Sequence, residues 1–138
     1  MRRGEILGLT WGQIDLKGGC IRLRPEDTKT NEGRDVPLKL ELVEMFKALP
    51  RGLPMTPVFT YKGHSIAEMK RSFATACKRA GIKDFTFHDM RHTFNTNAYR
   101  AGVPIPTIMK ITGHKSITMF RRYTTISLDD LREAVGKM

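Results

Sequence analysis

Acidic residues are scarce in this sequence: 14 Asp and Glu stand against 24 Lys and Arg, which leaves a net charge of +10. An excess of basic charge favours a polyanionic partner, nucleic acid first and an anionic membrane surface second. Long hydrophobic runs are also missing, since no apolar stretch approaches the roughly 18 residues that a membrane span needs. The chain opens without a signal-peptide pattern. We therefore expect a cytoplasmic protein with no membrane partner.

Cysteine is nearly absent, with only Cys20 and Cys77 in the whole chain. Both lie in apolar patterns, far apart in the sequence, so we interpret them as reduced, half-buried residues and as no metal site. Hydrophobic residues make up 40% of the chain, which favours a packed core over disorder. The length of 138 residues fits one domain of ordinary size.

The first third of the chain predicts a small sheet. Gly18 and Gly19 separate two short alternating runs at residues 13–16 and 20–24, which is a hairpin pattern. A second turn, "EDTKTNEG", leads into "RDVPL", and Pro37 then ends the ladder. We expect three antiparallel strands.

The rest of the chain predicts helices, so the expected fold class is α+β, mostly helical, with the small sheet near the N-terminus. Helical spacing appears at 39–49 and 66–80, where the second stripe ends at Gly81. A helix at 88–101 stops at Gly102, and a shorter one stops at Gly113. A further short helix or turn is expected near 116–123, and a terminal helix after Ser127, a favourable N-cap.

The chemistry centres on "TFHDMRHTF", which begins at Thr86. His88 and His92 lie four residues apart, as zinc ligands on a helix would, whereas His88 and Arg91 lie three apart and suit an anion. A zinc site would need a third ligand, and the positive charge of Arg91 on the same side opposes it. An arginine fork suits phosphate, but such a pair alone is more often an ordinary surface feature.

Four motifs taken together resemble the tyrosine recombinase family, the phage integrases and their relatives. "RRGEILGLTW" is similar to the family's first motif, "TKTNEGRDVPL" to its β-hairpin motif, "HDMRHTF" to its His-x-x-Arg motif and "TGHKSITMFRRYTT" to its closing motif. They occur in the family's order and with its spacing. Carried over position by position, the family's catalytic residues fall on Arg2, Lys29, His88, Arg91, His114 and Tyr123.

The resemblance implies a site-specific DNA recombinase that needs neither metal nor ATP, with no cofactor. Tyr123 would attack a DNA phosphodiester to form a 3′-phosphotyrosine intermediate, and strand exchange would follow. A phenol with a pKa of about 10 needs a base, for which His88 is the candidate. Lys29 on its turn would be the general acid for the leaving hydroxyl. Arg2, Arg91 and His114 would donate to the phosphate oxygens.

The sequence departs from the family at several positions. Thr112 replaces the leucine that is usual before Gly-His, Phe87 a proline, and Thr125 a second histidine. The opening segment reads as a helix already under way, with no capping residue before it. We therefore expect residues 1–138 to be a single, N-terminally truncated catalytic domain, without the family's upstream DNA-binding domain. Such a fragment could be inactive alone.

The resemblance also implies partners: double-stranded DNA, and a homo-oligomer, a tetramer on DNA, formed through the C-terminal helix. Two other classes stay open, a zinc hydrolase and a non-catalytic DNA-binding fragment of an integrase. Two tyrosines compete with Tyr123: Tyr99 is interpreted as core, and Tyr61 as a loop residue near backbone phosphate. Further candidate phosphate contacts are Arg22, Arg24, Lys70, Arg71, Lys78, Arg121 and Arg122.

Overall fold

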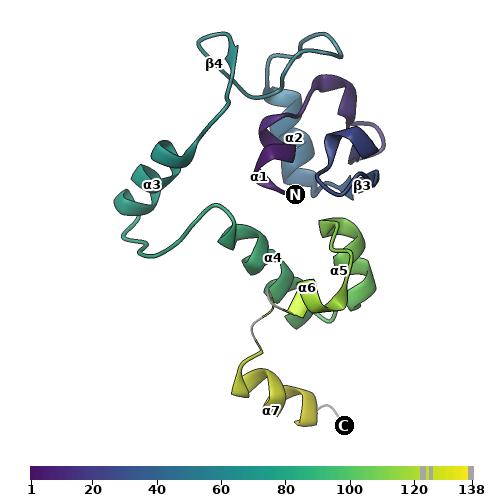
Figure 1. Ribbon diagram of the computed structural model, residues 1–138, viewed down its shortest axis with the longest axis vertical. Coiled ribbons are helices and arrows are strands. Elements are labelled where there is room, and N and C mark those ends of the chain that lie inside the picture. The colour runs from purple at the N-terminus through teal and green to yellow at the C-terminus, as the bar shows by residue number, and fades with distance from the viewer. Residues whose placement is uncertain (122–123, 125, 137–138) are drawn as a thin grey trace.

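The computed structural model describes residues 1–121, 124 and 126–136. Tyr123, the predicted nucleophile, and Arg122 lie outside the described residues. The elements run in chain order from α1 near the N-terminus to α7 near the C-terminus (Figure 1). The α+β class is confirmed, because most of the regular structure is helical and the one three-stranded sheet is small and antiparallel.

The sheet is built from β1 (Ile14–Asp15), β2 (Cys20–Leu23) and β3 (Arg34–Pro37), in the order β1-β2-β3. The predicted strands are confirmed in place and order, although β1 is shorter than expected. Its neighbour Gln13 belongs instead to a 3-10 turn, η1 (Trp11–Gln13). Pro37 is the last paired residue of β3, as predicted.

Strand register builds the core. Ile14 pairs with Ile21, and Ile21 pairs with Val36, so three β-branched side chains lie side by side across the sheet. Because side chains alternate between the two faces of a strand, this register buries one face as a unit. The buried apolar cluster contains Leu9, Trp11, Ile14, Ile21, Leu23, Val36, Phe46 and Val58.

Two helices accompany the sheet in the first half of the chain, α1 (Arg3–Leu7) and α2 (Leu40–Ala48), along with a 3-10 turn, η2 (Pro25–Asp27). Helix α2 matches the stripe predicted over 39–49 and contributes Phe46 to the core. Helix α1 begins without a conventional cap, as expected, but Glu5 compensates. Its carboxylate accepts the backbone N–H of Arg2 at 2.7 Å.

The second half of the chain is helical apart from a small hairpin, β4 (Thr60–Tyr61) and β5 (His64–Ser65). The hairpin turns through Lys62 and Gly63, both with positive φ. The helices are α3 (Lys70–Arg79), α4 (Asp89–Arg100), α5 (Ile105–Thr112), α6 (Ile117–Arg121) and α7 (Leu128–Gly136). None of these described helices has both the length and the apolar composition that crossing a membrane requires.

Helix α3 begins later than its apolar stripe predicts. The stripe starts at Ile66, but the helix starts at Lys70. The Glu68 carboxylate accepts the backbone N–H groups of Met69 and Lys70, each at 2.9 Å, and so satisfies donors that the helix itself leaves unpaired. The predicted stops are confirmed: Gly81 and Gly113 both follow helices with positive φ.

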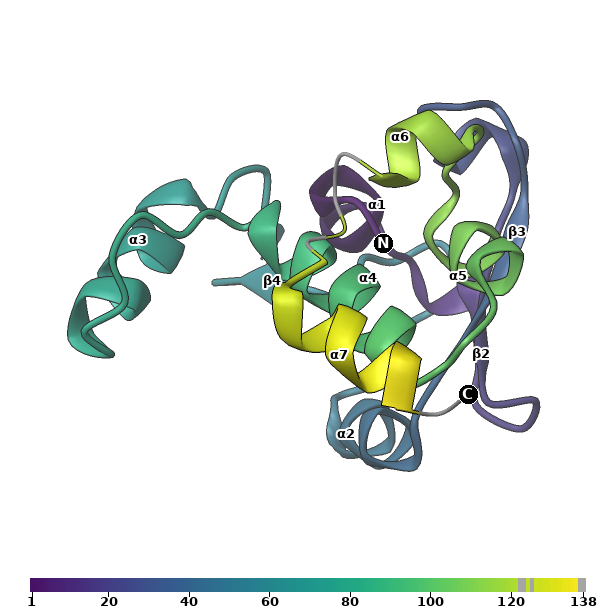
Figure 2. The ribbon, with the colours of Figure 1, turned by 90° about the horizontal axis from the view of Figure 1, so that it is seen from below.

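The elements form a body with two extensions. The sheet with α1 and α2 lies above α4, α5 and α6, while α3 lies to one side and α7 extends away at the lower end (Figure 1). Seen from below, α3 again stands apart from the rest (Figure 2).

Ser127 caps α7 as predicted: its hydroxyl accepts the Asp130 backbone N–H at 3.3 Å, and the Asp130 carboxylate accepts the Ser127 N–H at 2.6 Å. Cys20 and Cys77 are free and half-buried.

Asn95 on α4 is fully buried, and neither its amide nitrogen nor its amide oxygen has a partner among the described residues. We expect Asn95→Ala to raise the free energy of unfolding by about 1 kcal/mol, since it removes buried polar groups and improves helix propensity. Urea denaturation measures the change. The control Asn97→Ala, on an exposed position of the same helix, tests propensity alone. An Asn95→Ala variant that gains less unfolding free energy than the control would contradict the expectation.

Candidate active site

Two arginines share one buried carboxylate at the start of the chain. Glu5 on α1 accepts from Arg2 Nη1 at 3.0 Å and from Arg34 Nη2 at 2.6 Å. The side chains of Glu5 and Arg34 are only 3% and 6% exposed, whereas that of Arg2 is 20% exposed. One carboxylate therefore pairs with two guanidinium groups, so the cluster has a net positive charge. Of the two guanidinium groups, that of Arg2 is the more accessible.

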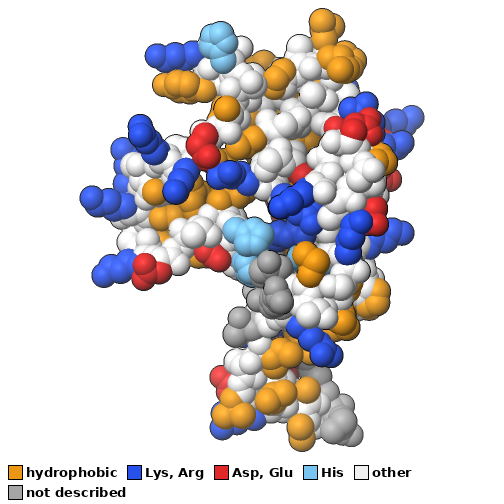
Figure 3. Space-filling view, viewed as in Figure 1, with side chains coloured by type: hydrophobic (Ala, Val, Ile, Leu, Met, Phe, Trp, Pro, Cys, Tyr) orange, Lys and Arg blue, Asp and Glu red, His pale blue; other side chains and the backbone are white. Residues whose placement is uncertain are grey.

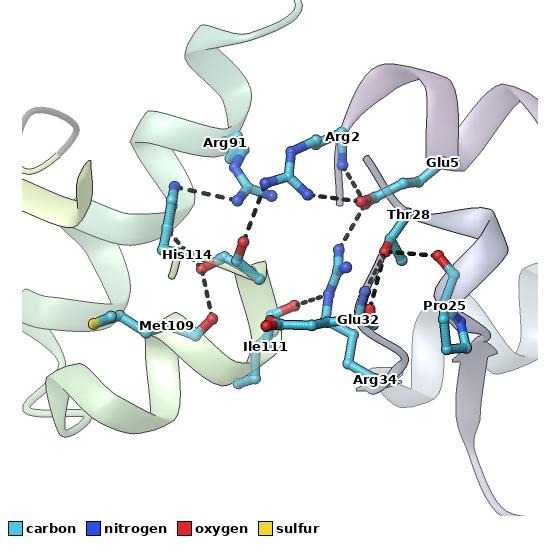
Figure 4. Close-up of polar contacts among 12 residues, drawn as sticks. Arg2, Glu5, Pro25, Thr28, Glu32, Arg34, Arg91, Met109, Ile111 and His114 are labelled. Carbon is cyan, nitrogen blue, oxygen red and sulfur yellow. Dashed lines mark hydrogen bonds and ion pairs between the residues drawn. The ribbon is translucent and has the colours of Figure 1, made fainter. Parts of the chain in front are cut away.

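The same cluster attaches α1 and β3 to the end of α5. Arg34 Nε donates to the Ile111 carbonyl at 3.2 Å, and Arg2 Nη2 donates to the Gly113 carbonyl at 3.1 Å (Figure 4). Gly113 has a φ of +71°, and a Cβ there would lie 2.9 Å from Arg34 Cζ. Only glycine fits both requirements. The segment that leads into His114 is thus held against Arg34 and Arg2.

Glu5 stays ionised in this setting. Burial acts to raise the pKa of its carboxyl, but the hydrogen bonds from Arg34 and Arg2 outweigh burial, and the net pKa lies below its usual range. An ionised Glu5 holds both guanidinium groups in fixed positions. The sequence analysis did not single out Arg34 as a partner of this cluster.

A second group of contacts joins Arg91 to His114. Both side chains are buried at 7% exposure, and Arg91 Nη2 lies 3.1 Å from His114 Nε2. The other ring nitrogen, Nδ1, lies 2.8 Å from the Thr112 hydroxyl. Helix α4 presents Arg91, and the turn after α5 presents His114, so the packing of two helices brings them together (Figure 4).

His114 is neutral at neutral pH. Burial is the main cause, and the positive charges of Arg91 and Arg2 add to it, so the pKa of the imidazole falls from 6.5 to about 4. A neutral ring keeps one nitrogen as an acceptor for Arg91. A cationic ring would instead place two positive charges 3.1 Å apart.

This shift predicts an acid-sensitive stability. Because the folded-state pKa of His114 lies below its unfolded value, its contribution is complete above pH 6.5 and is lost as the pH falls toward 4. The loss reaches about 3 kcal/mol below pH 4. We expect the unfolding free energy of His114→Gln to fall less steeply over this range than that of the wild type. Denaturant titrations at several pH values test this, with His64→Gln at an exposed position as the matched control.

His88 lies at the start of α4, and its ring meets that of His92 edge-on at 4.8 Å. Burial lowers the pKa of His88 below 6.5, and the nearby His92 and Arg91 lower it further, so His88 is suited to accept a proton. A cleft of about 540 Å³ opens beside His88 and Arg91, lined also by Arg3, Lys70, Phe73 and Phe87. Among the described residues, no group of three His, Cys, Asp or Glu could hold a metal ion.

Lys29 lies on the exposed turn between β2 and β3, as the hairpin motif predicts. The Thr28 hydroxyl fixes this turn by accepting the Glu32 N–H at 3.0 Å, and the Glu32 carboxylate pairs with Lys115 Nζ at 3.1 Å. The turn is therefore attached next to the His114 segment. The described hydrogen bond and ion pair attach the turn through Thr28 and Glu32 rather than through Lys29 itself.

The structure thus brings Arg2, Arg91 and His114 into one polar cluster, with His88 at the edge of the adjoining cleft. Figure 3 shows Lys and Arg side chains gathered around the central hollow of this face, with histidines at its edge. Tyr61 is exposed at 69% but lies in strand β4 rather than in a loop, and Tyr99 is only partly buried on α4 rather than part of the core. Tyr123 lies outside the described residues, and its predicted role remains a prediction.

Two contributors escaped sequence reasoning, Arg34 and Thr112. Alternation in "RDVPL" could have revealed the first, because Arg34 and Val36 share a face and Val36 is buried. Thr112 was noted only as a departure from the family's leucine, and its hydrogen bond to His114 depends on the turn after α5, which spacing alone does not reveal.

Known proteins resemble this chain over most of its length. It is 34% identical to the integrase of Salmonella phage P22 over 96% of this chain and 38% of that protein. It is 38% identical to a shufflon-specific DNA recombinase of Escherichia coli over 90% of this chain and 31% of that protein. The crystal structure of XerA recombinase matches with a TM-score of 0.81 and 26% identity, over 99% of this chain and 51% of that one.

The chain therefore spans about a third to a half of the length of these relatives. The XerA likeness covers the sheet and the helices that carry Arg2, Arg91 and His114, because it extends over nearly the whole chain. The model of the phage integrase family matches residues 1–129, which include all four motifs and every predicted catalytic position. This chain belongs to the phage integrase family.

Proposed function

We propose that this chain catalyses site-specific DNA recombination, by cleaving and rejoining strands through a 3′-phosphotyrosine on Tyr123. The observation that carries the proposal is the convergence of Arg2, Arg91 and His114 from three separate segments onto one cluster. Two arginine forks beside each other suit a phosphodiester in its transition state, where negative charge grows on the equatorial oxygens.

Each residue has a role in this scheme. His88 takes the proton from the tyrosine hydroxyl, which suits its lowered pKa. Arg2 and Arg91 donate to the phosphate oxygens. A phosphate between them adds negative charge beside His114 and raises its pKa, so that a protonated Nε2 becomes a donor to the same phosphate. The chain's own residues supply every proton that the scheme needs, so it includes no metal or nucleotide.

Lys29 completes the scheme as the general acid that protonates the leaving 5′-hydroxyl. We expect Lys29→Ala to slow cleavage of ordinary DNA by about 10²- to 10⁴-fold. A 5′-bridging phosphorothiolate leaves as a thiolate and needs no acid, so cleavage of that substrate should be nearly normal. The control is Lys17→Ala, a lysine on the exposed turn between β1 and β2. Equal defects of Lys29→Ala on both substrates would exclude the acid role.

Double-stranded DNA is the proposed partner, and the cytoplasm the proposed location. The net charge of +10 and the exposed Lys70, Arg71 and Lys78 on α3, beside the cleft of His88, support a DNA path across this face. The recombinase of Escherichia coli that resembles this chain is named for its action on DNA.

A tetramer on DNA is proposed through α7. Its apolar residues Leu128, Leu131 and Val135 are 55–67% exposed, and the helix extends away from the body (Figure 1). An apolar groove of about 490 Å³ on the body, lined by Leu42, Met45, Phe46, Phe59, Phe94 and Ile111, offers a matching surface on a second copy. Exchange of α7 between copies would bury the apolar residues of α7 and the apolar groove together.

The test traps the covalent intermediate. The chain is incubated with a pool of random-sequence duplexes that carry 5′-bridging phosphorothiolates, because the released thiolate religates poorly. We expect an adduct that survives SDS, and mass spectrometry should locate the 3′-phosphate on the peptide that contains Tyr123. DNA binding with no adduct would instead favour a non-catalytic DNA-binding fragment.

A further inference from the structure

Thr112, the last residue of α5, is 1% exposed, and its hydroxyl makes three hydrogen-bond contacts, the longest of them at 3.4 Å to the Met109 carbonyl, which like any carbonyl can only accept. Oγ1 lies 2.7 Å from the Ile108 carbonyl and 2.8 Å from His114 Nδ1. A hydroxyl has one proton, and a carbonyl can only accept. The hydroxyl proton therefore goes to Ile108, and Oγ1 can meet Nδ1 only as an acceptor. Nδ1 of His114 must be protonated.

The opposite side of the ring gives the same answer independently. Nε2 of His114 lies 3.1 Å from Nη2 of Arg91, and a guanidinium only donates. Nε2 must therefore be the unprotonated nitrogen. A neutral imidazole has one donor and one acceptor nitrogen, so both neighbours select the same tautomer.

We infer that Thr112 is a positioning residue, which locks His114 as the Nδ1–H tautomer and thereby aims its Nε2 lone pair at Arg91. The chain of contacts runs from the Ile108 carbonyl through Thr112 and His114 to the Arg91 guanidinium. A leucine at this position, usual in the family's motif, has no acceptor for Nδ1–H. The consequence for catalysis rests on the proposed function, but the tautomer itself does not.

The groups around the ring are consistent with this arrangement. Arg91, His88 and His92 on α4 and Arg2 at the start of the chain all act on His114 in the sense that disfavours a second ring proton. Thr112 is the described side chain that hydrogen-bonds Nδ1. Its loss should release the Nδ1 side of the ring, while the Arg91 side keeps its donor.

The test uses ¹⁵N-labelled chain without DNA at pH 7. Long-range ¹H–¹⁵N NMR spectra should show His114 with a protonated Nδ1 and an unprotonated Nε2. Thr112→Ser should keep this pattern. Thr112→Val, which preserves shape but removes the acceptor, should exchange the Nδ1 proton with water about tenfold faster, as the loss of one hydrogen bond predicts. Thr107→Val, on an exposed position of α5, is the matched control.

Two outcomes overturn the inference: a protonated Nε2 in the wild type, or a Thr112→Val spectrum and exchange rate equal to those of the wild type. If Thr112→Val does not fold, the wild-type tautomer and the Thr112→Ser spectrum still decide. The second measurement is adduct formation with the phosphorothiolate pool, where Thr112→Val should lower the rate of adduct formation at saturating DNA without weakening DNA binding, and Thr112→Ser should restore the rate. A wild type that forms no adduct would refute the proposed function and leave the tautomer result standing.

Discussion

A Tyr123→Phe variant is expected to form no covalent adduct with DNA, while it binds DNA as tightly as the wild type. The substitution removes one hydroxyl, the only atom that would attack phosphorus, and leaves the ring and the net charge of the chain unchanged. SDS gels of the phosphorothiolate reaction measure the adduct, and a gel-shift titration at fixed salt measures binding. The expected loss is complete within detection.

Two matched controls test whether the loss of the adduct is specific to the Tyr123 hydroxyl. Tyr61→Phe removes a hydroxyl from the exposed β4–β5 hairpin, and Tyr99→Phe removes one from a partly buried position on α4. Both variants should form adducts at the wild-type rate. An adduct in Tyr123→Phe, or its loss in either control instead, would assign the nucleophile elsewhere.

Glu5→Ala is expected to cost about 3–5 kcal/mol of unfolding free energy, because it leaves the buried Arg34 without its carboxylate. The Arg34 side chain is 6% exposed, and the bond to Glu5 is one of its two described hydrogen bonds, at 2.6 Å. Removal of Glu5 also frees the Arg2 N–H that begins α1. Thermal and urea unfolding of the variant measure the loss.

The matched control is Glu44→Ala on α2, which breaks an exposed ion pair with Lys47. Such pairs contribute about 0–1 kcal/mol, so the control should change little. Glu5→Gln is the informative intermediate, since it keeps the shape but removes the charge and replaces one acceptor oxygen with an NH2 donor. Similar losses in Glu5→Ala and Glu44→Ala would show that Arg34 is not held by charge.

The sequence by itself determined the class of fold and the family, and it named the residues of the candidate site as predictions. Apolar spacing located the helices, and glycines at 81 and 113 marked two helix ends correctly. Alternation and the Gly18–Gly19 pair located the first hairpin. Ordered motifs pointed to the phage integrase family, and the family match over residues 1–129 bears this out. These features can be predicted from the sequence because helical periodicity and turn formation depend on residues that are close together in the chain.

Only the tertiary structure decided how the site is held together. The start of α3 at Lys70 depends on Glu68, and the burial of Arg34 depends on where β3 meets α5. The bond from Arg2 to the Gly113 carbonyl joins residues 111 positions apart, and that from Arg91 to His114 joins α4 to the turn after α5. Motifs name such residues, but whether a ring nitrogen donates or accepts is set by the partners that packing brings within hydrogen-bonding distance.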